Sequence, residues 1–80
     1  MEKVHIERLK KTLEYLESKQ RELRRETEKD TRSIESMIKF LKKDMIEQFK
    51  LFEYNLYIKQ EIKNTDNFIS SVRDIIDEQS

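Results

Sequence analysis

The sequence predicts an all-helical protein, either a long-helix coiled coil or a helical hairpin or bundle, and in both cases an oligomer. Three observations predict this class. Apolar residues recur at alternating steps of three and four in one register from Ile6 to Ile76, which is the signature of a coiled coil. Glycine and proline, the commonest helix breakers, are both absent. Charged residues make up 42% of the chain, a content typical of helices with solvated faces.

Intrinsic disorder is the main competitor of this reading, because high charge with low hydrophobicity is also typical of chains that do not fold. The periodicity argues against it. Most a and d sites of the heptad register are apolar, although only 35% of the whole chain is. With 80 residues, we expect a single module over residues 1–80, too small for a large core without a partner.

The first candidate helix spans residues 2–29. Leucines at heptad core positions define its apolar side as far as Leu23, but Leu23 is the only apolar residue between Glu17 and Ser33. The second half of this segment can therefore form a helix but cannot bury much surface.

A fold-back near residues 27–33 is slightly favoured over one continuous helix. This stretch is polar, and Asp30, Thr31 or Ser33 could cap a following helix by accepting a backbone N–H bond. The rival is an uninterrupted helix about 115 Å long. Folding back would let the first helix cover the broad apolar face of the next segment.

The second candidate helix spans residues 34–63 and is apolar on most of its circumference. Beyond the a and d sites it carries aromatic residues such as Phe40 and Tyr57. A helix of this kind needs more than one neighbour, so the middle of the chain predicts a bundle. We expect its rings to be core or interface, and the binding energy to concentrate in residues 34–62.

The third candidate helix spans residues 66–79, with Thr65 or Asp66 as its N-cap. Across all three segments the residues expected at helix–helix interfaces are Leu9, Leu13, Leu16, Leu23, Ile34, Met37, Leu41, Met45, Phe49, Leu51, Phe52, Leu56, Ile58, Ile62, Ile69, Val72 and Ile76.

Asp30 and Asp44 fall at d sites, where a parallel homodimer would bring each beside its own copy. That arrangement is therefore disfavoured.

Composition also predicts which kinds of chemistry are missing. Without cysteine there is no disulfide or thiolate metal site, and without glycine there is no phosphate-binding loop of the usual kind. His5 is the only histidine, and a lone histidine is no basis for acid–base catalysis. We therefore expect no enzymatic activity, no cofactor and no bound metal.

A basic stripe gives the alternative functional reading. On a continuous helix, Arg21, Arg25, Lys29 and Arg32 would lie along one side and could contact nucleic-acid phosphates, an acidic ligand or an acidic partner helix. Neighbouring acids, and an overall balance of 17 basic against 17 acidic residues, weaken the attraction for nucleic acid.

The leading functional expectation is a protein–protein interaction and assembly module: an oligomerisation or scaffold protein that packs against its own copies or another helical protein. No apolar stretch is long enough to span a membrane, and no signal peptide is recognisable after Met1. We expect an intracellular protein, cytoplasmic or nuclear. The 80 residues are compatible with a whole protein or with a segment of a longer one.

Overall fold

The fold consists of three α-helices and two short 3-10 helices. A computed structural model describes residues 1–25 and 31–80. In chain order the elements are α1 (Lys3–Arg25), α2 (Arg32–Phe49), η1 (Leu51–Glu53), η2 (Ile58–Lys63) and α3 (Thr65–Gln79). No β-strand occurs in either described range. The prediction of an all-helical protein is confirmed.

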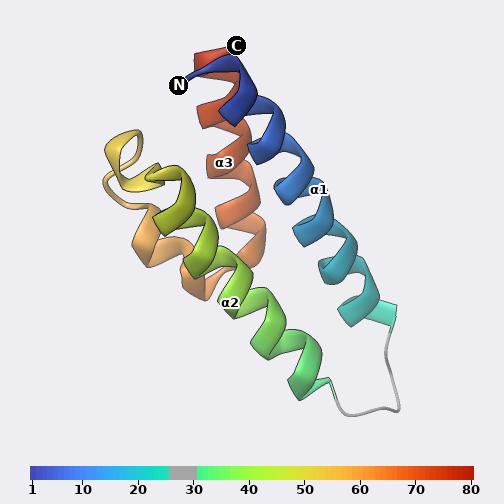
Figure 1. Cartoon of the computed structure of the whole chain (residues 1–80). Coiled ribbons are helices and arrows are strands. Elements are labelled where there is room, and N and C mark those ends of the chain that lie inside the picture. Colours follow the sequence, from blue (N-terminus) through green and yellow to red (C-terminus); the bar gives the residue numbers. More distant parts are fainter. Residues whose placement is uncertain (26–30) are drawn as a thin grey trace.

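The helices pack together instead of forming one rod. α1 and α2 lie side by side and run in opposite directions, and α3 returns beside α1, so the two chain ends meet at one end of the molecule (Figure 1). The N-terminal ammonium donates a hydrogen bond of 2.8 Å to the Gln79 side chain there. The Cα atoms extend over 41 × 22 × 17 Å. The favoured turn at residues 27–33 lies mostly outside the described residues.

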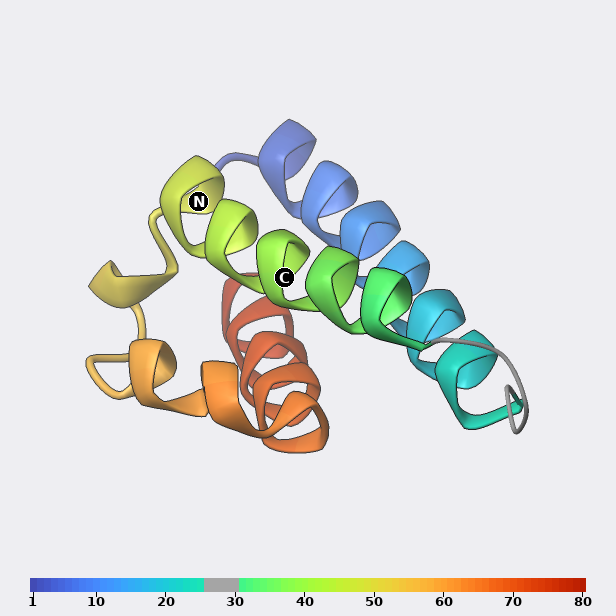
Figure 2. The ribbon, with the colours of Figure 1, turned by 90° about the horizontal axis from the view of Figure 1, so that it is seen from below.

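η2 lies between α2 and α3 and contacts both of them. Seen from below, the segment from the end of α2 to the start of α3 curves around one side of the molecule (Figure 2). α3 therefore packs on both α1 and η2, and η2 links it to α2.

The expected helix over 34–63 is not continuous. α2 ends at Phe49 because Lys50 adopts a left-handed conformation, with φ 51° and ψ 47°, and its N–H bonds to the Ile46 carbonyl. Further along, the Asn55 side chain accepts a hydrogen bond of 2.9 Å from the Tyr57 N–H, which is a turn geometry that competes with helix. Short 3-10 turns replace the rest of the helix.

α3 begins one residue before the predicted 66–79, and its cap differs from the expectation. Asn64, not Thr65 or Asp66, is the N-cap residue: its backbone is extended and its side chain accepts a 3.1 Å hydrogen bond from the Asn67 N–H. Asparagine is among the best N-cap residues because its side-chain oxygen satisfies an otherwise unpaired helix N–H.

The core is one continuous cluster to which all three helices, η1 and η2 contribute. Its fully buried side chains include Leu9 and Leu16 of α1, Met45 of α2 and Phe68 of α3. Within the described ranges, no helix combines the length and the hydropathy that crossing a membrane would require.

Candidate interaction surfaces

Most residues predicted at helix–helix interfaces are buried or half-buried by the fold of a single chain. Ten of them are buried in the common core: Leu9, Leu13, Leu16, Met45, Phe49, Leu51, Ile58, Ile69, Val72 and Ile76. Four are partly buried against it: Leu23, Ile34, Leu41 and Ile62. Three are exposed: Met37, Phe52 and Leu56. The intramolecular fold thus leaves only part of the predicted interface available to a partner.

α2 buries a side of the helix that differs from its heptad a and d positions. Its buried residues Ile38, Met45 and Phe49 do not occupy a or d sites, whereas Met37 at a d site is exposed. Asp44, also at a d site, is exposed, so the cost of a carboxylate at the seam does not arise within the protomer. Asp30 lies outside the described residues. α2 buries this other side because α1 and η2 both pack against it.

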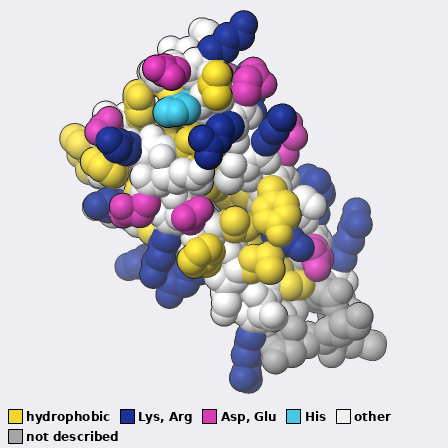
Figure 3. Space-filling view, in the orientation of Figure 1, with side chains coloured by type: hydrophobic (Ala, Val, Ile, Leu, Met, Phe, Trp, Pro, Cys, Tyr) yellow, Lys and Arg dark blue, Asp and Glu magenta, His cyan; other side chains and the backbone are white. Residues whose placement is uncertain are grey.

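Three exposed apolar side chains of α1 and α2, Tyr15, Met37 and Phe40, form one surface, which we call the α1/α2 face. Phe40 is 66% exposed, Tyr15 48% and Met37 41%. The Tyr15 hydroxyl lies 3.8 Å from the Met37 sulfur, as a weak hydrogen-bond donor to it, so the surface is continuous between the helices. Hydrophobic side chains gather on the side that the two helices share in the space-filling view (Figure 3).

Charged groups border the α1/α2 face. The Lys19 ammonium lies 5.5 Å from the centre of the Tyr15 ring, within cation–π range, and pairs with Glu22 at 3.1 Å. The hydrogen bond and the attraction from Glu22 raise the pKa of Lys19. An apolar centre with a charged edge is the usual anatomy of a protein-binding surface.

A second exposed apolar group lies between α2 and η2. It consists of Phe52, Leu56 and Tyr57, and Leu56 is 83% exposed. The Lys59 ammonium lies 5.2 Å from the centre of the Phe52 ring. Of the aromatic residues expected to be core or interface, only Phe49 is buried, Tyr54 is half-buried, and Phe40, Phe52 and Tyr57 are exposed.

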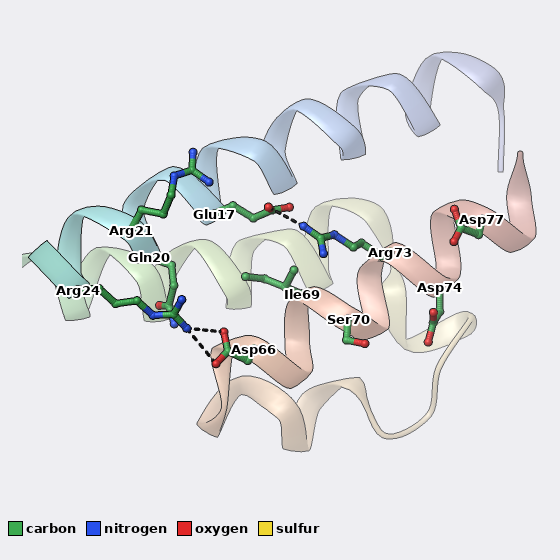
Figure 4. Close-up of a pocket in the computed structure, with 10 residues that line it drawn as sticks. All are labelled: Glu17, Gln20, Arg21, Arg24, Asp66, Ile69, Ser70, Arg73, Asp74 and Asp77. Atoms are coloured by element: carbon green, nitrogen blue, oxygen red, sulfur yellow. Dashed lines mark hydrogen bonds and ion pairs between the residues drawn. The ribbon is translucent and has the colours of Figure 1, made fainter.

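A groove of about 600 Å³ runs between α1 and α3 and carries mostly charged side chains. Figure 4 shows that two ion pairs, Arg24–Asp66 and Arg73–Glu17, cross the groove. Arg24 bonds to both carboxylate oxygens of Asp66 at 2.9 and 3.0 Å, and Arg73 bonds to Glu17 at 2.6 Å. These contacts tie α3 to α1. Because the pairs are largely exposed, each is worth about 0–1 kcal/mol.

The predicted basic stripe is divided between two helices in the described structure. Arg21 and Arg25 are exposed on α1, and Arg32 is the first residue of α2. Lys29 lies outside the described residues. Arg21 also lines the α1–α3 groove together with Glu17 and Asp66, but those two carboxylates bond to Arg73 and Arg24 instead.

Lys42 is a buried lysine that the heptad register did not reveal. Only 5% of the residue is exposed, and its ammonium donates hydrogen bonds to the Ile62 carbonyl at 2.5 Å and the Thr65 hydroxyl at 2.8 Å. Burial lowers the pKa of Lys42, and the nearby Lys39 lowers it further. A signal was present in the sequence: Lys42 lies in the stripe of Ile38, Met45 and Phe49 at helical spacing.

In the described ranges, no group of three or more histidine, cysteine, aspartate or glutamate side chains is placed to hold a metal ion.

Comparisons with known proteins add no further constraint. No protein-family model, curated protein or solved structure matches the chain.

Proposed function

We propose that this protein is an assembly module that packs helix against helix, with the α1/α2 face as its binding surface and a second copy of the chain as its first partner. The observation that carries the proposal is the exposure of Tyr15, Met37 and Phe40 on one continuous surface. The fold does not need these side chains for its core, and contiguous exposed apolar groups are typical of interaction sites.

A second copy fits this face in the antiparallel orientation. A two-fold axis at Phe40 would stack the two exposed rings and cover Met37 of both copies. The chain has no net charge, so two copies do not repel each other overall.

Sedimentation equilibrium over a concentration series tests this function. We expect the wild-type chain to dimerise reversibly, and Phe40→Asp to abolish dimerisation, since it places two carboxylates at the two-fold axis. Val4→Asp is the matched control, because Val4 is as exposed as Phe40 but lies near the start of α1. Circular dichroism should show that both variants keep their helices.

Three outcomes decide between partners. Loss of the dimer in Phe40→Asp alone supports the proposed face. A dimer that survives Phe40→Asp but dissociates in Leu56→Asp would move the interface to the surface around Phe52 and Tyr57. A wild-type chain that remains monomeric at about millimolar concentration, where even a Kd of 1 mM would be visible, would contradict self-association.

A further inference from the structure

We propose that the pocket beside Lys42 binds a small organic carboxylate that carries an apolar tail. The pocket lies where α1, α2 and the junction of η2 with α3 meet, and its volume is about 400 Å³, within the usual range for small-molecule sites. The proposal concerns a different side of α2 from the α1/α2 face and does not depend on assembly.

The polar lining of the pocket is strongly cationic. Lys39, Lys42 and Lys63 all line it, against a single acidic residue, Glu35. Within residues 1–25 and 31–80, none of the three lysines forms an ion pair. The Glu35 carboxylate accepts a hydrogen bond from the Thr31 hydroxyl instead. An anion would therefore meet three lysines against one carboxylate, an excess of positive charge.

Lys42 supplies the directional contact. Its ammonium has three N–H donors, and two of them bond to uncharged oxygens on the pocket wall, the Ile62 carbonyl and the Thr65 hydroxyl. One donor remains for a ligand. A buried cation that has only neutral acceptors lacks a counter-charge to offset its desolvation cost. A carboxylate oxygen at hydrogen-bond distance would supply that charge and counteract the effect of burial, which lowers the pKa of Lys42.

The rest of the wall is apolar and determines what must be attached to the carboxylate. Leu23 of α1, Ile38 of α2 and Ile62 of η2 line the pocket together with the lysines. Leu23 and Ile62 are only partly buried by the fold, so a hydrocarbon tail would remove further apolar surface from water, at about 25 cal/mol per Å². A bare inorganic anion would gain nothing from this wall.

Titration of the ¹⁵N-labelled full chain separates the two parts of the ligand. Sodium octanoate carries both a carboxylate and a tail, acetate only the carboxylate, and 1-octanol only the tail. We expect octanoate to shift the amide signals of residues 38–42 and 62–65 saturably. We expect acetate and octanol to bind at least about tenfold more weakly, since each loses one set of contacts worth over about 1.4 kcal/mol.

Charge-removing variants test the assignment of the lysines. Lys42→Met should weaken octanoate binding at least about tenfold, and Lys39→Gln should weaken it severalfold while leaving the buried hydrogen bonds intact. Lys43→Gln is the control, because Lys43 is exposed and does not line the pocket. If Lys42→Met fails to fold, Lys39→Gln and Lys63→Gln carry the test. Octanol binding as tightly as octanoate, or shifts confined to Tyr15, Met37 and Phe40, would overturn the proposal.

Discussion

Two phenylalanines separate the folded-back structure from a continuous coiled coil. Phe40 and Phe68 each precede an a site of the heptad register, Leu41 and Ile69, so a continuous coiled coil would give them equivalent surroundings. In the structure Phe68 is fully buried, whereas Phe40 is 66% exposed. Truncating each ring to alanine should therefore have very different effects on the free energy of unfolding.

The expected magnitudes follow from burial. Phe68→Ala removes a buried ring and leaves a cavity, which costs about 3–5 kcal/mol. For Phe40→Ala, full burial of such a side chain is worth about 1.5–3 kcal/mol. With about a third of the residue buried, the loss is roughly 0.5–1 kcal/mol. A domain of this length has a total stability of roughly 4–12 kcal/mol, so Phe68→Ala should remove at least about a quarter of it.

Urea unfolding followed by circular dichroism at low micromolar concentration measures both losses on the protomer, with any dimer dissociated. Phe68→Leu, which should cost less than Phe68→Ala, is the fallback if the alanine variant is already unfolded. Similar losses for Phe40→Ala and Phe68→Ala would refute the fold-back. A large loss at Phe40 that appears only at high protein concentration would instead place Phe40 at a dimer interface.

Three further perturbations test local features. Because burial lowers the folded-state pKa of Lys42 below 10.5, the folded state binds fewer protons than the unfolded state between those two pKa values. The stability of the wild type relative to Lys42→Met should thus rise with pH across that window, and a flat difference would contradict this. Asn64→Ala removes the α3 cap and should cost about 0.5–2 kcal/mol in urea unfolding, whereas Asn67→Ala should be nearly neutral; equal effects would argue against the cap. Lys50→Gly relieves a left-handed backbone and should stabilise the protein by up to about 1 kcal/mol, which would raise the melting temperature. Lys43→Gly inside α2 should lower the melting temperature. A loss of stability in both variants would contradict the assigned conformation.

The first and last helices were predictable because their buried sides follow the heptad. Leu9 and Leu16 of α1 and Val72 of α3 occupy d sites and are buried as that pattern requires. Phe68 and Ile75 of α3 are buried as well, although neither was among the predicted interface residues. A helix with two neighbours buries a wider stripe than the two positions of a coiled-coil seam, so these residues needed a wider template.

The middle segment was less predictable for two physical reasons. Its apolar residues cover most of the helix circumference, so the sequence allowed several buried sides, and only the positions of α1 and η2 select the one around Met45. The end of α2 depends on a left-handed Lys50, a conformation that glycine usually marks. A lysine there gives no sequence signal, although Asn55 and Asn64 downstream are residues that favour turns and caps.

The candidate surfaces could be predicted only in part. The expectation that apolar residues in 34–62 form interfaces included Met37 and Phe52, which are exposed, but the same list held residues that the core uses. The sequence cannot separate these two groups, because both are apolar at helical spacing. The lysine pocket depends on the approach of Lys63 and Thr65 to α2, a contact made only after the chain folds back.

Small-angle X-ray scattering on a dilution series tests most directly whether a compact three-helix protomer assembles through helix packing. At low concentration we expect the scattering mass of one 9.9 kDa chain and a radius of gyration close to the 12.8 Å of the Cα atoms, somewhat enlarged by side chains and hydration. At high concentration the mass should double while the particle remains much shorter than a rod. A longest dimension near 115 Å, the length of a continuous helix of this chain, would contradict the fold-back, and a mass that stays at one chain throughout would contradict self-assembly.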